Sequence, residues 1–317
     1  MTQSCRRGGC PHRRSSELDA LVAESGCCVT AIEASLDRIM EDVAGFDGAV
    51  SVTSNAVAVM TEIGRPPAVS HAGAPFELPS RGGALRVDPT AVGSVLAVER
   101  APYGRLPCSV QFYAREGAAQ HKLFLASLTD DYAFAEMTRD WSAPCGPAPG
   151  AKDPRAGTFS DLLSWRCGDL RFHVDSLFGD AGLRRRACLP EWGAGHAWRI
   201  DPELAVHLLG LVTEIRAPVT VIVPNNGFAQ CFTGAYDGMR RAGDGLRLGG
   251  PQSTVSLNLA DVEEAWITRR DEDGGSSLSL ELYDWGFQCV AQVTAASGDE
   301  RLARFWNQTV RDIPRLG

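Results

Sequence analysis

A hairpin-like segment that occurs twice is the feature of this 317-residue chain that most restricts its fold. Residues 218–234, PVTVIVPNNGFAQCFTG, place valines at alternate positions before Asn225-Asn226-Gly227 and a second apolar run. Alternation predicts strands, and Asn and Gly predict a tight turn because they tolerate a positive φ. Residues 49–64, AVSVTSNAVAVMTEIG, have the same pattern, with Asn55 matched to Asn226.

The likeness continues beyond the two hairpins. A spacing of 170 residues (283 − 113 = 170) separates three further pairs: Tyr113 and Tyr283, Val92 and Val262, and Arg100 and Arg270. One match could arise by chance. Several at nearly one spacing indicate a duplicated domain rather than a solenoid of short repeats.

Composition limits the classes of function. With 44% hydrophobic and 22% charged residues, the chain can bury a sizeable core. Its net charge of −8 gives no overall basic field, so we expect no nucleic-acid partner. No apolar run approaches a membrane span, and the basic N-terminus leads into no apolar segment. We therefore expect a cytoplasmic protein that is not membrane-embedded, with its ten cysteines reduced.

The pattern of elements predicts four regions: a flexible tail (1–15), an N-terminal repeat (16–141), a linker rich in Pro, Gly and Ala (142–157) and a C-terminal repeat (158–317). Helical periodicity over 15–43, broken at Gly26, predicts two helices before the first strands. Residues 64–83 are predicted to be a loop. Further helices are predicted near 130–141, 158–165, 201–215 and 300–311.

The tail holds Cys5, Cys10 and His12, and the pair Cys27-Cys28 could complete a metal site. The spacing is not that of a zinc knuckle, and adjacent cysteines chelate poorly. We interpret the tail as solvated and leave the role of this cluster open.

Three segments resemble the bacterial haem-utilisation family typified by HemS, HmuS and ChuS. They are residues 109–125 (SVQFYAREGAAQHKLFL), residues 197–234, and residues 257–270 together with SLELYD at 279–284. The resemblance covers most of residues 45–310. It implies an α+β fold, a tandem duplication of a large curved antiparallel β-sheet unit with flanking helices, with haem bound between elements of the two halves.

The resemblance also implies site residues. His173, ahead of Leu183-Arg184-Arg185, takes the place of the axial ligand of the haem iron, and a neutral imidazole is a strong ligand for iron. Arg86 takes the place of an arginine on the opposite face of the haem, and Arg185 that of a basic residue facing a propionate. From residue type alone, His173 could simply pack on a helix or loop, Arg86 could be an exposed arginine at a strand end, and Arg185 could belong to a solvated face.

Two departures bear on haem binding. Thr294 and Ser297 stand where the family has a tyrosine and an arginine that help to hold haem. Haem affinity or orientation is therefore expected to differ from that of the family.

The resemblance implies a haem-binding protein of iron utilisation, which either carries haem or degrades it oxidatively as a haem oxygenase-like enzyme. It would receive haem from a transporter, and degradation would need an electron donor. The alternative is a duplicated scaffold that has lost haem and binds a protein or another small ligand. The sequence does not decide between carrier and enzyme, and it leaves the reductant, the product and the oligomeric state open.

Overall fold

The structure, a computed structural model, describes residues 16–24, 26–71, 78–100, 108–126, 130–142, 170–272, 275–296 and 300–316. Its elements before residue 143 are α1 (Glu17–Ala23), β1 (Cys27–Ala31), α2 (Leu36–Ala44), β2 (Ala49–Ser54), β3 (Ala58–Gly64), β4 (Ala68–His71), β5 (Gly82–Val87), β6 (Ser94–Arg100), β7 (Ser109–Tyr113), β8 (Ala119–Leu125) and α3 (Asp130–Trp141).

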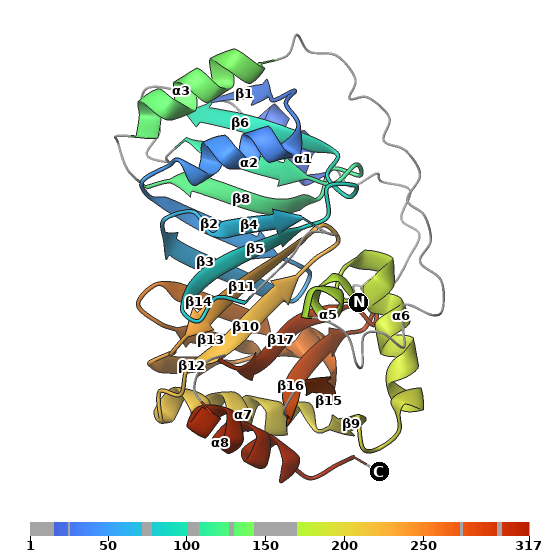
Figure 1. Ribbon diagram of the computed structural model, residues 1–317. Coiled ribbons are helices and arrows are strands. Elements are labelled where there is room, and N and C mark those ends of the chain that lie inside the picture. Colours follow the sequence, from blue (N-terminus) through green and yellow to red (C-terminus); the bar gives the residue numbers. More distant parts are fainter. Residues whose placement is uncertain are drawn as a thin grey trace, which may run out of the picture.

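From residue 170 onward, the described elements begin with two helices and a short 3-10 turn, which precede the second set of strands (Figure 1). They are α5 (Leu170–Asp175), α6 (Gly179–Cys188), η1 (Leu189–Trp192), β9 (Ala197–Ile200), α7 (Pro202–Glu214), β10 (Val219–Pro224), β11 (Phe228–Gly234), β12 (Gly238–Ala242), β13 (Gly245–Gly249), β14 (Ser253–Asn258), η2 (Leu259–Asp261), β15 (Val262–Glu272), β16 (Gly275–Asp284), β17 (Cys289–Ala295) and α8 (Glu300–Arg311).

The two halves repeat one another element by element. Strands β8 and β17 begin 170 residues apart (289 − 119 = 170), and so do helices α3 and α8 (300 − 130 = 170). Strands β2 and β10 keep the same spacing (219 − 49 = 170). The predicted tandem duplication is therefore confirmed, and each copy is mainly antiparallel sheet with helices at its ends.

The repeats share their sheets rather than forming one each. A nine-stranded sheet has the order β1-β6-β7-β8-β2-β3-β14-β13-β12, and an eight-stranded sheet has the order β4-β5-β11-β10-β17-β16-β15-β9. Strands β12 to β14 of the second repeat thus extend the first sheet, and β4 and β5 of the first repeat extend the second (Figure 1). Among the described strand pairs, only β4 and β5 run parallel.

The two hairpin turns hold each other through reciprocal asparagines. Asn55 donates from Nδ2 to the carbonyls of Pro224 and Val290, 2.8 Å each. Asn225 donates to the carbonyls of Ser54 (3.0 Å) and Gln120 (2.7 Å), which are the equivalent positions in the other repeat. The counterpart of Asn55 is therefore Asn225, and the match to Asn226 predicted from the sequence is wrong by one residue.

The turn chemistry also differs from the prediction. None of residues 225–227 has a positive φ. The Asn225 side chain instead accepts the backbone N–H groups of Gly227 (3.0 Å) and Phe228 (2.8 Å), which is an Asx-type turn. A Cβ at Gly227 would lie 2.7 Å from the Gln120 Oε1 atom, so a larger residue there would make the Gln120 side chain shift.

The predicted helices at 130–141, 201–215 and 300–311 are confirmed by α3, α7 and α8. Residues 27–31, predicted as helix, form strand β1, because this β-branched edge segment pairs along its length with β6. Residues 68–71, predicted as loop, form β4 beside β5. The tail at 1–15, the predicted helix at 158–165 and all but Ser142 of the linker lie outside the described residues.

The second sheet is covered on both faces. One face packs with α7 and α8 around an apolar core that includes Val221, Leu280 and Trp306. The opposite face packs against α5, α6 and η1 through Val174, Leu177 and Trp192. None of the helices in the described part of the chain has the length and apolarity that a bilayer span needs.

We expect Asn225→Ala to lower the free energy of unfolding by about 2–3 kcal/mol, because two carbonyls of the other repeat and two turn N–H groups lose their partner. Asn226→Ala is the matched control, since Asn226 is exposed, and should change stability by less than about 0.5 kcal/mol. Urea denaturation of the two variants decides which asparagine is structural, and equal losses would contradict this assignment.

Candidate functional site

A buried carboxylate lies at the centre of the face covered by α5 and α6. Glu281, in β16, accepts hydrogen bonds from Arg185 through Nε (3.1 Å) and Nη2 (2.5 Å). It also accepts from Thr268 (2.6 Å), Tyr283 (2.6 Å) and Gln292 (3.0 Å). The carboxylate is fully buried, and this set of donors satisfies both of its oxygens.

The charge of Arg185 keeps Glu281 ionised. Burial by itself raises the pKa of this carboxyl, but the nearby guanidinium outweighs burial and lowers the pKa to about 2. Arg185 is itself buried, and its guanidinium lies 5.1 Å from the centre of the Trp192 ring. The pair is thus a buried salt bridge that anchors α6 to the second sheet.

His173, in α5, is connected to the same carboxylate through Gln292. The Nε2 atoms of Gln292 and His173 are 2.7 Å apart. Because Gln292 Nε2 also donates to the Glu281 carboxylate, this atom is the amide nitrogen, and His173 Nε2 must be the acceptor. The proton of the imidazole is therefore assigned to Nδ1, which has no hydrogen-bond partner among the described residues.

The imidazole of His173 is neutral at physiological pH. It is only 4% exposed, and burial together with the charge of Arg185 lowers its pKa to about 3. A neutral imidazole is the form of histidine that ligates iron, and it does so through the ring nitrogen that carries no proton, which is Nε2 in His173.

Arg86 is fully buried in β5 and forms a bidentate ion pair with Asp175 of α5. Its Nε lies 2.7 Å from Oδ1, and its Nη2 lies 2.9 Å from Oδ2. Nη1 donates to Ser70 (3.2 Å). Since β5 belongs to the first repeat, this pair fixes α5 to a strand contributed by the other half of the chain.

The three residues predicted from the sequence therefore meet around α5. His173 and Asp175 belong to this helix, and Ser176 follows it directly. Ser176 donates to the His173 carbonyl (2.6 Å) and accepts from Arg185 Nη1 (3.1 Å). One short segment thus contacts each of the two arginines and carries the histidine.

The other positions singled out in the sequence are Thr294, Ser297 and the cluster Cys5, Cys10 and His12. Thr294 is buried in β17 and donates to the Leu278 carbonyl at 3.2 Å, so it serves the sheet. Ser297, Cys5, Cys10 and His12 lie outside the described residues.

Sequence reasoning missed Asp175, Glu281 and Gln292. In the strand Ser279-Leu280-Glu281-Leu282-Tyr283, alternation favours a solvent-facing Glu281, but α5 and α6 cover that face. The first repeat contains one signal that position 281 is a hydrogen-bonding position. The equivalent position in the first repeat is Gln111, which also accepts a hydrogen bond from a tyrosine two residues later, Tyr113, at 2.7 Å.

A model of a protein family described as "Haemin-degrading HemS.ChuX domain" matches residues 14–141 and 182–312. The chain belongs to this family. The resemblance inferred from the sequence is therefore confirmed, and the two matched segments correspond to the two repeats.

Curated relatives in this family are similar over part of their length. The hemin transport protein HmuS of Yersinia pestis is 25% identical over 183 residues, which are 55% of this chain and 53% of the relative. The hemin transport protein HemS of Yersinia enterocolitica is 24% identical over 193 residues, 58% of this chain and 56% of the relative. The aligned part thus spans about half the length of these relatives.

Solved structures of the family share the fold over almost the whole chain. Holo-PhuS, a heme-binding protein from Pseudomonas aeruginosa, has a TM-score of 0.76 at 21% identity and covers 94% of this chain and 89% of its own. ChuS, named an E. coli heme oxygenase, has a TM-score of 0.73 at 20% identity, with coverage of 90% and 89%. These likenesses show that the chain has the fold of these proteins.

We expect Arg185→Ala to destabilise the protein by about 3–5 kcal/mol, because it leaves the Glu281 carboxylate buried without its cation. Arg184→Ala, which alters the adjacent residue of the same helix, should change the free energy of unfolding by less than about 0.5 kcal/mol. Guanidinium denaturation at neutral pH measures both. An equal, small effect of the two substitutions would show that Arg185 is not a structural anchor.

Proposed function

We propose that this protein binds haem in the cytoplasm as part of iron utilisation, with His173 as the axial ligand of the iron. The observation that carries the proposal is the neutral, buried His173 imidazole near Arg185, on a helix whose Asp175 pairs with Arg86, in a member of this family. Imidazole suits iron, and guanidinium groups suit carboxylates such as the haem propionates.

His173, Arg86 and Arg185 are the kinds of side chain that bind haem, but their present contacts have to rearrange before haem can bind. The acceptor nitrogen of His173 is engaged by Gln292, and α5 is fixed to β5 by the Arg86–Asp175 pair. Ligation through this nitrogen requires His173 to give up the Gln292 contact. We propose that the Arg86–Asp175 pair opens when α5 shifts to admit the macrocycle, and this would free the Arg86 guanidinium to face it.

Carrier and enzyme differ in what the residues do after binding. When bound, haem supplies the iron centre and the ring that oxygen chemistry would attack. A carrier needs only His173 and the arginines to hold haem reversibly. An enzyme also needs Arg86 as a fixed hydrogen-bond donor on the reacting side, with electrons from an external donor. We propose two partners: a transporter that delivers haem to the protein, and the external donor that supplies these electrons.

His173→Ala should abolish the Soret band of defined 1:1 stoichiometry that appears when hemin is titrated into the wild-type protein, or shift it strongly. The reason is that axial ligation is the strong directional bond in the proposed site. His207→Ala, on the exposed side of α7, is the control and should titrate like the wild type. A wild-type spectrum and affinity in His173→Ala would reject the ligand assignment.

Arg86→Ala should slow haem degradation about a hundredfold while weakening haem binding less, because a donor to developing anionic oxygen is worth on the order of 3 kcal/mol. Loss of the Soret band is followed with a reductant, oxygen and catalase, at equal haem occupancy, and the tetrapyrrole product is identified. Asp175→Asn keeps the guanidinium but weakens the ion pair, so it should retain degradation and take up haem faster.

A stable Soret band in the wild-type protein under these conditions would reject the enzyme and leave the carrier. Loss of haem at the same rate in Arg86→Ala as in the wild type would reject the role of Arg86 without rejecting degradation.

A further inference from the structure

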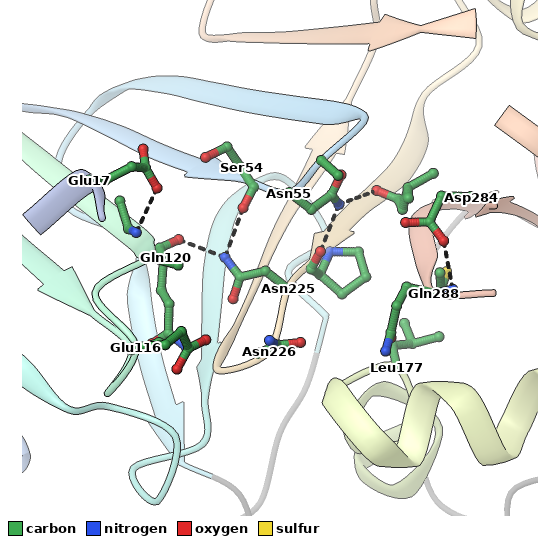
Figure 2. A pocket seen from close by; sticks show the side chains of 17 residues that line it. Glu17, Ser54, Asn55, Glu116, Gln120, Leu177, Asn225, Asn226, Asp284 and Gln288 are labelled. Atoms are coloured by element: carbon green, nitrogen blue, oxygen red, sulfur yellow. Dashed lines mark hydrogen bonds between the residues drawn. The ribbon is translucent and has the colours of Figure 1, made fainter. Parts of the chain in front are cut away.

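Strands β3 and β11 leave the two hairpin turns that Asn55 and Asn225 hold together (Figure 2). Strand β3 belongs to the nine-stranded sheet, and β11 belongs to the eight-stranded sheet. A polar pair connects the two strands beyond the turns, where Gln230 of β11 donates from Nε2 to the Glu62 carboxyl of β3 at 3.4 Å. A contact of this length is weak, so the pair bridges the two sheets without fully satisfying either side chain.

Glu62 is buried at this junction without a cation to balance it. Its side chain is only 7% exposed, and it forms no ion pair with any described residue. Ser51 and Ser253 lie opposite Glu62 on the two neighbouring strands. The carboxyl also lies against the backbone of Gly83 in β5, where a Cβ would clash with it. These neighbours are uncharged, and a carboxylate among them would be unfavourable.

The titratable groups on the described elements packed around Glu62 do not supply the missing charge. Burial raises the pKa of the Cys231 thiol in β11 and that of the Tyr236 phenol after β11, so both groups stay neutral. Arg86 of β5 is held by its ion pair with Asp175. Burial therefore dominates at Glu62 and raises the pKa of its carboxyl to about 7, although the Gln230 hydrogen bond lowers it in part.

The Gln230 amide gives independent evidence for a proton at this pair. Its side chain is fully buried, and its Oε1 atom has no hydrogen-bond partner among the described residues. An amide oxygen needs a donor, which a carboxylate cannot provide and an un-ionised carboxyl can. When Glu62 carries a proton, the acid and the amide can form two hydrogen bonds, N–H to one carboxyl oxygen and O–H to the amide oxygen.

The duplication shows that the fold does not require a polar pair at this junction. The position equivalent to Glu62 is Phe232 (232 − 62 = 170), and the position equivalent to Gln230 is Met60 (230 − 60 = 170). Met60 and Phe232 are buried together in one apolar core. The same two strands thus carry an apolar pair at one of two related positions and an acid with an amide at the other.

We propose that Glu62 is a proton-dependent lock between the two sheets. With its proton, Glu62 closes the acid–amide pair with Gln230 and holds β3 against β5 and β11. When the proton leaves, the Gln230 oxygen loses its donor and the junction contains a charge that nothing nearby balances. Ionisation of this one carboxyl therefore weakens the connection between the two sheets.

Urea denaturation of the full chain at about pH 5 and about pH 8 measures the lock. Because the folded-state pKa of Glu62 is raised, the stability that the lock contributes is complete below the pKa of an unfolded glutamate, and it is lost as the pH rises through about 7. Between these two conditions the folded-to-unfolded ratio should fall on the order of fiftyfold more in the wild type than in Glu62→Gln. Glu41→Gln, at an exposed position of α2, is the charge-matched control and should behave like the wild type.

Infrared spectroscopy detects the proton itself, because an un-ionised carboxyl and a carboxylate absorb at different frequencies. At about pH 6, where exposed carboxyls are ionised, the wild type should show an un-ionised carboxyl band that is absent from Glu62→Gln and disappears as the pH rises through about 7. Gln230→Leu should move this loss to higher pH, because it removes the hydrogen bond that lowers the pKa of Glu62.

Absence of the band from the wild type would overturn the proposal whether or not the variants fold. A pH dependence of stability that is the same in Glu62→Gln as in the wild type would overturn it as well. Neither measurement uses haem, so the result does not depend on the proposed function.

Discussion

The burial of one negative charge, that of Glu281, determines how the second half of this protein is arranged. A carboxylate in an apolar interior is tolerated only when it is paired and hydrogen-bonded, and Arg185, Thr268, Tyr283 and Gln292 meet this requirement together. Through Arg185 the carboxylate holds α6, and through Gln292 it reaches His173. The orientation of the proposed iron ligand is therefore a consequence of an electrostatic constraint in the sheet.

The duplication lets the two repeats serve as references for one another. Gln111 and Tyr113 form a neutral hydrogen bond where Glu281 and Tyr283 form a charged one. In the first repeat, α1 covers the Gln111–Tyr113 pair. In the second repeat, α5 and α6 cover the Glu281–Tyr283 pair. The same strand positions thus support a neutral contact in one copy and, in the other, a charged cluster that reaches the proposed iron ligand.

Much of the fold could be predicted from the sequence because strand alternation and helical periodicity are local signals. The spacing of 170 residues located the duplication, and helices α3, α7 and α8 lie where periodicity placed them. Strand β1 was missed, because its pairing with β6 is a tertiary contact that outweighs local propensity. The exchange of β5 and β14 between the sheets has no local signal at all.

The candidate site was predictable in its residues but not in their partners. His173, Arg86 and Arg185 follow from the family resemblance, and the structure gathers them around α5. Asp175 and Gln292 occupy positions that look ordinary in sequence. Their roles depend on a helix packing against strands from both repeats, and only the assembled structure specifies that.

Sharing strands between repeats has a consequence for how the chain reaches its native state. Met60 pairs with Val255 across 195 positions (255 − 60 = 195), and Arg86 is opposite Ala229 across 143 (229 − 86 = 143). Contacts this distant along the chain form slowly, since long loops must close before they are made. During synthesis, β3 and β5 would emerge long before β14 and β11, with open edges that can join other chains. The interlocked sheets that bring the two halves of the molecule together thus make its nascent first repeat prone to aggregation until the second repeat arrives.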